Sequence, residues 1–347
     1  MKKRRLQIFL GLMLGAALLW WLFRETEWSK VFAAFLDCDW RWLIAAEFFI
    51  FLTFFARVQR WSYIVRAVKP VSWRALFSAT QIGFLANFTL PGRVGEFIRA
   101  VVLARLAALP ISQGLAFVAL DRVTDLFGLI AMMLVAAAAF QPAGDIVLPA
   151  ELNAPVIPAD AIRTTTVLTL VAMLAIILAF VLLYLNQRLA LRLNDAIVGS
   201  VSRKLAARTH QMLEHFADGM HVFRSWSDMG LSIFFSLLTW LIGAGHFTCV
   251  LFAFGMAPPW YAPFVVMALL AIAISLPSTP GFVGLYQLGI IGAVLLTMPQ
   301  ADLDVAKAAA ILAHLINLLT VVVVGLFCLY REGFHLGELR GKGSGES

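Results

Sequence analysis

The sequence predicts an all-α polytopic membrane protein, with about six full spans and two re-entrant helical hairpins arranged as an inverted-topology repeat. Of its 347 residues, 61% are hydrophobic and only 14% are charged, whereas soluble chains carry roughly 45–50% apolar and about 25% charged residues. The apolar residues form long continuous runs, which are typical of spanning helices and not of the short alternating strands of a membrane β-barrel. This composition excludes a soluble enzyme, a nucleic-acid-binding protein and a disulfide-stabilised secreted module.

Ten apolar stretches follow one another along the chain. We interpret six as full spans: Leu6–Phe23, Trp42–Ala56, Gly114–Phe140, Thr164–Leu185, Met229–Phe254 and Val305–Tyr330. The first span ends in Trp20 and Trp21 without a small-residue cleavage site, so we expect a retained helix and not a signal peptide. The four remaining stretches are short and flank a Pro-Gly pair: Ala75–Leu90, Val94–Leu109, Pro263–Leu276 and Phe282–Met298. A full crossing needs about 20 residues, so these pairs suit hairpins that return to their own side, with short double crossings as the alternative.

The basic residues predict how the chain is oriented. With both termini in the cytoplasm, segments 1–5, 57–74, 187–228 and 331–347 hold 18 Lys and Arg residues, against 5 in the outer segments. This asymmetry follows the positive-inside rule. We therefore expect a multi-pass membrane protein with one transmembrane domain over residues 1–330 and a short cytoplasmic tail over 331–347. Most of the net charge of +7 is then a topology signal.

The cytoplasmic segment 187–228 is the longest polar part of the chain. Apolar residues such as Leu189 and Leu193 recur at helical spacing among Arg188 and Arg192. This pattern predicts a basic amphipathic helix that lies on the inner leaflet and is attracted to anionic lipid. Nucleic-acid binding is not expected, because positive-inside sorting produces the same basicity.

The two halves of the chain, 6–163 and 164–330, show the same order of elements in opposite orientation. Their hairpin tips, Leu90–Gly95 and Thr279–Gly284, share the pattern P-G-x-V-G. Inverted repeats with Gly/Pro-broken segments are typical of transporters, whose substrate site lies between the repeats. We therefore expect the hairpin backbone at Pro91, Gly92, Gly95, Pro280, Gly281 and Gly284 to help form such a site.

The first hairpin carries four candidate substrate-binding side chains, Asn87, Arg93, Glu96 and Arg99. Glu96 and Arg99 are three residues apart and share a helix face. Free backbone amides at a helix start attract anions, and an arginine beside them has a fork suited to phosphate. We interpret the tip as a site for a lipid phosphate or a carboxylate. The alternative is that Arg93 and Arg99 only anchor the tip in the headgroup layer.

Three charged residues, Asp121, Arg122 and Asp125, lie within the span Gly114–Phe140. Charges at such depth are costly, usually face the bundle interior and often mark a pathway. Substrate binding is one interpretation. The alternative is a structural ion pair that joins this helix to the first hairpin through Arg93 or Arg99.

The second hairpin is nearly neutral. Tyr286 and Gln287 are its best candidates for polar contact with substrate, whereas its glycines are explained by close helix packing. Elsewhere in the spans, Glu47 and His314 are isolated polar residues, for which a packing role and proton coupling are the two interpretations. No His or Cys spacing matches a metal site, so neither metal nor cofactor is expected.

The segments Asn87–Arg99 (NFTLPGRVGEFIR) and Thr279–Gly284 (TPGFVG), with the Asp-Arg pair between them, resemble those of the lysylphosphatidylglycerol synthase transmembrane-region family, also called the flippase-like domain family. The resemblance covers about Leu6–Tyr330. It implies a multi-pass inner-membrane fold, and several members are linked to moving lipids or lipid-linked sugars between leaflets. The residues that match the family's first motif are Pro91, Gly92, Arg93, Gly95, Glu96 and Arg99.

The resemblance also marks two differences. The family usually has a Glu in its second motif where this chain has Gln287, so a hydrogen-bonding role replaces a carboxylate role there. The soluble aminoacyl-transfer domain of some members is not expected in the 17 residues after Tyr330, and neither is lysyl-lipid synthesis.

Three functions are then compatible with the sequence. The leading one is a flippase-like transporter that moves an anionic amphipathic lipid, either a phospholipid or a sugar linked to polyprenyl phosphate. The second is a non-transporting accessory protein of a glycosyltransferase or envelope-lipid pathway. The third is an enzyme acting on a lipid-linked sugar, with Glu96, Asp121 or Asp125 as general base. Segment 187–228 lacks an Asp-x-Asp or Gly-rich phosphate loop, so we do not expect an enzyme.

Overall fold

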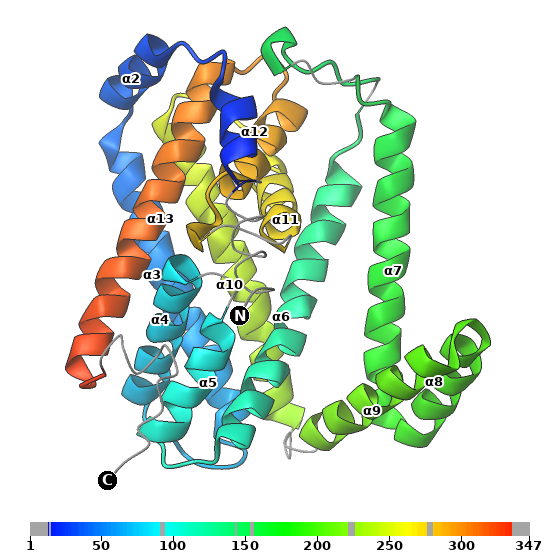
Figure 1. Ribbon diagram of the computed structural model, residues 1–347. Coiled ribbons are helices and arrows are strands. Elements are labelled where there is room, and N and C mark those ends of the chain that lie inside the picture. Colours follow the sequence, from blue (N-terminus) through cyan, green and yellow to red (C-terminus); the bar gives the residue numbers. More distant parts are fainter. Residues whose placement is uncertain are drawn as a thin grey trace.

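The computed structural model describes residues 13, 15–90, 94–142, 144–152, 156–220, 226–275 and 280–334. These residues are mostly helical, and within them the only β pairing is an isolated antiparallel bridge between Ile146 and Ile157. A helical segment at 15–23 precedes the labelled elements (Figure 1). These are α2 (Trp28–Asp37), α3 (Trp40–Val65), α4 (Trp73–Thr89), α5 (Gly95–Leu106), α6 (Ile111–Ala139), η1 (Ala150–Leu152), α7 (Ala159–Leu185), α8 (Gln187–Val201), α9 (Arg203–Met220), α10 (Trp226–Ala253), α11 (Ala262–Ser275), η2 (Pro280–Phe282), α12 (Leu285–Thr297) and α13 (Leu303–Arg331).

Five of the described helices, α3, α6, α7, α10 and α13, are long and apolar enough to cross a membrane. They correspond to five of the six expected spans, and the protein is a membrane-embedded, multi-pass protein. Of the sixth, Leu6–Phe23, residues 6–12 and 14 lie outside the described residues, and 15–23 are helical. The four short stretches form the shorter helices α4, α5, α11 and α12, as their length predicted.

The second span is longer than the sequence suggested. We expected it to end at Ala56, but α3 continues to Val65. The reason is that Val58, Trp61, Ile64 and Val65 are buried at helical spacing and pack into the core. The interpretation of residues 57–65 as cytoplasmic loop was therefore wrong, and the two arginines in that stretch belong to a spanning helix.

The cytoplasmic amphipathic segment is also different from the expectation of one helix. It forms two helices, α8 and α9, because Ser202 is extended and its hydroxyl accepts a hydrogen bond from the Leu205 amide at 3.3 Å. Thr209 donates to Asn194 Oδ1 at 2.7 Å, which ties the two helices into a hairpin. Hydrogen bonds from His210 and Asn194 lower the pKa of the Asp195 carboxyl in the same hairpin.

The two membrane hairpins approach each other from opposite ends of the molecule. In Figure 1, α4 and α5 occupy the lower half, and α11 and α12 occupy the upper half. Their tips meet between these halves, where the rings of Phe88 and Phe282 pack edge-to-face with centroids 5.4 Å apart. Aromatic pairs of this geometry stabilise a contact beyond simple area burial.

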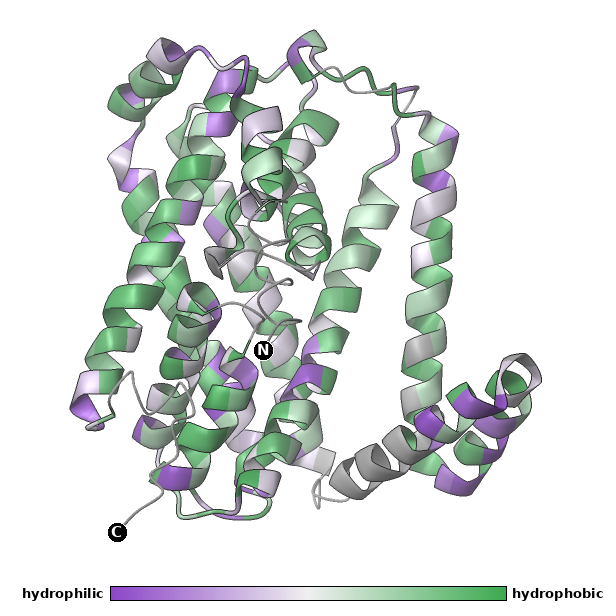
Figure 2. Cartoon of the chain, in the orientation of Figure 1, coloured by the Kyte–Doolittle hydropathy of each residue, from purple (hydrophilic) through white to green (hydrophobic). Residues whose placement is uncertain are grey.

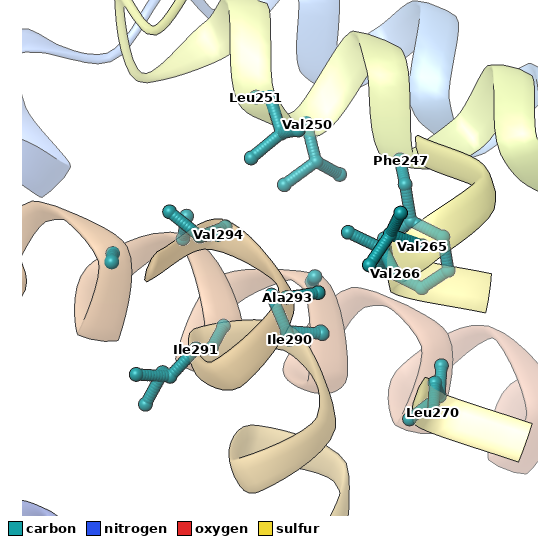
Figure 3. Close-up of a cluster of buried hydrophobic side chains, with 14 of the residues drawn as sticks. Phe247, Val250, Leu251, Val265, Val266, Leu270, Ile290, Ile291, Ala293 and Val294 are labelled. Atoms are coloured by element: carbon teal, nitrogen blue, oxygen red, sulfur yellow. The ribbon is translucent and has the colours of Figure 1, made fainter. Parts of the chain in front are cut away.

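Two hydrophobic cores correspond to the two hairpins. The upper core gathers residues of α10, α11, α12 and α13, among them Val250, Val266, Ile290 and Val294 (Figure 3). The lower core gathers residues of α3, α4, α5 and α6. Figure 2 shows that the long helices are mainly hydrophobic, that α6 carries a hydrophilic stretch in its lower half, and that hydrophilic residues are frequent in α8 and α9 and at the upper and lower ends of the bundle.

Helix α7 stands apart from the bundle (Figure 1). None of the described side chains in Ala159–Ala179 is buried, although this stretch has the composition of a span. It has a limited contact with α6, the loop residue Asp145 accepts a hydrogen bond from the Ala159 amide at its start, and the hairpin of α8 and α9 lies at its other end. Lipid therefore surrounds most of α7 in a bilayer.

Close helix crossings depend on glycine, and Gly114 gives a direct test. A Cβ atom added at Gly114 would lie 2.5 Å from the carbonyl oxygen of Ala100, across the contact between α5 and α6. We expect Gly114→Ala to destabilise the protein by about 1–3 kcal/mol, because overpacking forces the helices apart. The measurement is the melting temperature of purified protein in detergent.

Gly292→Ala is the matched control, since nothing lies within 4 Å of the Cβ position there. It should leave the melting temperature unchanged or raise it, because alanine favours helix more than glycine does. Equal melting temperatures for the two variants would contradict the close α5–α6 crossing.

Candidate functional site: a buried charge cluster

Asp121 on α6 is the centre of a charge cluster inside the lower half of the bundle. Its side chain is completely buried. Arg60 on α3 donates from Nε to Oδ1 at 2.8 Å, and Arg99 on α5 donates from Nη1 to Oδ2 at 2.6 Å. Each oxygen of one carboxylate is thus held by an arginine from a different helix. Buried charges need such pairing, since an isolated charge in an apolar interior is very costly.

Asp125 lies one turn further along α6 and extends this cluster to α10. It pairs with Nη1 of Arg60. It also accepts a hydrogen bond from the indole Nε1 of Trp240 at 3.0 Å. Gly128, the next small residue on this face of α6, allows the backbone of α10 to come close at Ser236. The two carboxylates of α6 therefore connect α3, α5, α6 and α10.

Arg99 is held by more than its ion pair. Its guanidinium lies over the ring of Trp61, 3.6 Å from the centroid, which is a cation–π contact. The Cβ atom of Arg99 packs against Gly83 of α4. A Cβ atom added at Gly83 would lie only 2.8 Å from it. Nη2 of Arg99 is nevertheless buried and has no hydrogen-bond partner among the described residues. Nε of Arg99 is likewise buried and without a hydrogen-bond partner among the described residues, so part of the hydrogen-bonding capacity of this arginine is unmet.

The open side of the cluster consists of Arg122 and Glu96. Their side chains are 40% and 33% exposed, and Nε of Arg122 lies 3.6 Å from Oε2 of Glu96. Arg122 also reaches Asp121 at 3.3 Å and Asp125 at 3.7 Å. These distances are longer than those of Arg60 and Arg99, so Arg122 is the more loosely held cation.

A fourth arginine, Arg57, is half-buried on α3 one turn before Arg60. It lies over the ring of Phe84 at 5.7 Å and interacts electrostatically with Asp125 and Asp121. The described part of this region therefore contains the four arginines 57, 60, 99 and 122 against the three carboxylates 96, 121 and 125. The cluster has an excess of positive charge and can attract an anion.

The first hairpin tip is described in part. Asn87 Oδ1 accepts the backbone amide of Gly95 at 2.8 Å, so Asn87 caps the start of α5. The predicted residues Pro91, Gly92 and Arg93 lie outside the described residues. Of the predicted substrate-binding side chains at this hairpin, the described cluster brings together Glu96 and Arg99.

The second hairpin is closed by neutral hydrogen bonds. Gln287 Oε1 accepts a hydrogen bond from the Gly284 amide at 2.8 Å, and Gln287 Nε2 donates to His314 Nδ1 at 2.9 Å. His314 in turn donates from Nε2 to the Gly281 carbonyl oxygen at 2.7 Å. The ring of Tyr286 stacks on His314 with centroids 4.4 Å apart. Gly281 and Gly284 have φ values of 71° and 87°, which favour glycine.

This chain of bonds explains why glutamine suits position 287. A neutral histidine with its proton on Nε2 needs a donor at Nδ1, and a side-chain amide supplies one while its oxygen still accepts from Gly284. A carboxylate could not donate to that nitrogen. Tyr286 and Gln287 are both buried, and their described contacts lie within the protein.

The residues that sequence reasoning missed are Arg57, Arg60, Trp61 and Trp240. The two arginines were assigned to a cytoplasmic loop, where basic residues are common. The signal that could have placed them is the apolar set Val58, Trp61 and Val65, which continues the helical spacing of the span. Among the described residues, no group of three or more His, Cys, Asp or Glu side chains could hold a metal ion, and the three cysteines are free thiols.

Comparison with known proteins gives one match to a family model. The model is described as the lysylphosphatidylglycerol synthase TM region, and it matches residues 8–325. A search of curated proteins finds no match to the chain.

Asp121→Asn tests the centre of the charge cluster. The asparagine carries no charge, so buried Arg99 loses its ion pair and buried Arg60 keeps only its pair with Asp125. We expect a loss of roughly 3–5 kcal/mol of stability, which is typical when one partner of a buried ion pair is removed. The measurement is thermal unfolding in detergent and the yield of folded protein.

Asp160→Asn serves as the control because its side chain is 94% exposed and lies 3.9 Å from Arg163. Exposed pairs of this kind contribute at most about 1 kcal/mol. If Asp121→Asn melts within a degree of Asp160→Asn, the cluster does not hold the bundle together.

Proposed function

The chain belongs to the lysylphosphatidylglycerol synthase transmembrane-region family, and from this membership and the charge cluster we propose that it is a flippase-like transporter of an anionic amphipathic lipid. A phospholipid or a sugar linked to polyprenyl phosphate has the required chemistry. The phosphate would bind at the open side of the cluster, and the acyl or prenyl chains would remain in the bilayer. The proposal includes no chemical turnover, because Glu96, Asp121 and Asp125 serve as partners of arginines.

The observation that supports this proposal is the excess of arginine on a partly open face within the membrane. Charged groups in this environment are expensive and usually mark a substrate or ion pathway. Arg122 is 40% exposed and loosely paired, and Arg99 has a donor without a protein partner. An arginine fork matches two phosphate oxygens, so an incoming headgroup would complete the hydrogen bonding of both side chains.

An apolar groove on the same helix supports a lipid as the substrate. It has a volume of about 290 Å³ and lies between α6, α7 and α11, with Met133, Phe140, Ile162, Leu170 and Leu269 among its lining residues. Helix α6 thus carries charge in its lower half and lines an apolar groove in its upper half. A molecule with an anionic head and a hydrocarbon tail fits both parts of this surface.

We further propose that the two halves form an inverted repeat with two re-entrant hairpins. The contacts between helices support this repeat. In the first half, α4 packs on α13 and α5 packs on α6. In the second half, the equivalent helices α11 and α12 pack on α6 and α13, respectively. The equivalent helices α3 and α10 pack on each other. Each of these contacts has its counterpart when the halves are exchanged. Alternate movement of the two hairpins would then expose the cluster to one leaflet and then to the other.

The cellular setting follows from the same proposal. The protein would lie in the bacterial inner membrane with both termini in the cytoplasm, and membrane lipids would be its partners. A glycosyltransferase or another lipid-synthesis enzyme would supply or consume the transported lipid.

Arg122→Gln tests the role of the open face. In proteoliposomes that contain a fluorescent anionic phospholipid, we expect the wild-type chain to accelerate movement between leaflets. The variant should slow it by about tenfold or more, since a charge-assisted hydrogen bond contributes roughly 1.5–3 kcal/mol. The readout is the fraction of label that a membrane-impermeant quencher bleaches over time.

Arg163→Gln is the control, because Arg163 is exposed near the start of α7 and its one described ion pair is weak. It should transport like the wild type. No acceleration by the wild-type chain over a panel of anionic phospholipids and polyprenyl phosphates would contradict the proposal and favour an accessory role.

The hairpin proposal predicts a pattern of cysteine labelling in a variant without Cys38, Cys249 and Cys328. Ala108→Cys, between α5 and α6, should react with a membrane-impermeant reagent from the cytoplasmic side only. Ala257→Cys, between α10 and α11, should react only from the other side. Thr89→Cys, at the end of α4, should not react from the side opposite Ala108→Cys. Labelling of Thr89→Cys from that opposite side would mean that the hairpin crosses the membrane completely.

A further inference from the structure

Glu47 is a carboxylate within α3, away from the ends of the helix, that the charge cluster does not include. It lies among Ile44, Phe48 and Phe51, which are 60%, 60% and 48% exposed and face the surrounding hydrocarbon in a bilayer. Oε1 lies 2.8 Å from the hydroxyl of Thr320 on α13, and Oε2 is buried without a partner. This environment contrasts with that of Asp121 and Asp125, whose oxygens face arginines.

The contacts of Thr320 indicate where the protons are. Its hydroxyl oxygen lies 2.8 Å from Glu47 Oε1 and also 2.8 Å from the carbonyl oxygen of Ile316. A hydroxyl has one proton to donate. If Glu47 is ionised, only one of these two contacts is a full hydrogen bond. If Glu47 carries a proton, it donates to Thr320, and Thr320 donates to Ile316, so both contacts are satisfied.

Other titratable groups around Glu47 do not supply a counter-charge. His246 on α10 donates from Nδ1 to the carbonyl oxygen of Ala46 at 3.0 Å, so its contact is to the backbone next to Glu47. On α13, His314 is bonded to the second hairpin. The nearest charged residues of α3 are Arg41 at its start and Arg57, which faces the cluster. None of them forms an ion pair with Glu47 among the described residues.

A polar line on α13 connects this carboxyl to the second hairpin. His314, Asn317 and Thr320 follow one another at intervals of three residues and therefore lie along adjacent turns. His314 bonds to the Gly281 carbonyl at the hairpin tip. Tyr286 of α12 bonds to Asn317. A change in the contact between Glu47 and Thr320 would thus act on the helix that anchors this tip.

We propose that Glu47 is a proton-binding site between the two halves of the protein, and that its protonation controls the contact of α3 with α13. In the conformation described, the carboxyl holds its proton and donates to Thr320. When α13 moves with the second hairpin, water enters the contact and takes the proton, and the ionised carboxylate is then solvated. The coupling to lipid movement rests on the proposed function, whereas proton binding by Glu47 does not.

The experiment is infrared difference spectroscopy of the full chain in phosphatidylglycerol-containing liposomes, titrated from acid to alkaline pH. We expect a protonated-carboxyl band at neutral pH that disappears at high pH. Glu47→Gln should remove this band, and Thr320→Val should shift its frequency because one hydrogen bond is lost. Glu151→Gln, at an exposed position of η1, should leave the band unchanged.

Two results would overturn the proposal. One is a band that is present and unshifted in Glu47→Gln. The other is a wild-type spectrum without a protonated-carboxyl signal at neutral pH, where exposed carboxyl groups are ionised. If Glu47→Gln does not fold, the frequency shift in Thr320→Val decides the question alone.

The coupling step is tested separately. A pH gradient should change lipid transport in the wild type but not in Glu47→Gln. An equal response of both would contradict the coupling while leaving the spectroscopic result intact.

Discussion

The ion pairs of Asp121 are the interaction on which the lower half of the molecule depends. In a membrane the hydrophobic effect does not drive helices together, so packing and polar contacts must do so. Asp121 binds Arg60 of α3 and Arg99 of α5 with its two oxygens, and Asp125 extends the connection to Trp240 of α10. Each partner would be severely destabilised alone in hydrocarbon. The helices are held together because separating them would expose unpaired charges.

The two hairpins are anchored by opposite means in equivalent places. Arg122 lies at the same distance from the start of α6 as His314 lies from the start of α13. On α6 this position belongs to a charged cluster with an open face. On α13 it belongs to a buried chain of neutral bonds through Gln287 and Gly281. The first hairpin is thus held beside a charged, partly open cluster, and the second is held by a closed network of neutral groups.

The sequence predicted the class and order of the elements well, because long apolar runs and Pro-Gly breaks are local signals. It placed the two carboxylates of α6 inside the bundle, where Asp121 is completely buried and Asp125 nearly so, whereas Arg122 lies on the partly exposed side. It did not place Arg57 and Arg60, because we ended the span at Ala56 although Val58, Trp61 and Val65 continue its helical spacing. Burial of Trp61 and pairing with Asp121 are tertiary facts that no local window contains. The split of the amphipathic segment at Ser202 was missed for the same reason, since the apolar spacing passes through it.

The isolation of α7 makes the bilayer part of the fold. No described side chain in Ala159–Ala179 is buried by protein, yet the space between this helix and α6 cannot remain empty in a condensed hydrocarbon phase. Acyl chains must therefore act as packing material there, as side chains do in a soluble core. Their length and unsaturation would set the spacing of α7 from the bundle, so the same polypeptide would adopt slightly different widths in membranes of different composition.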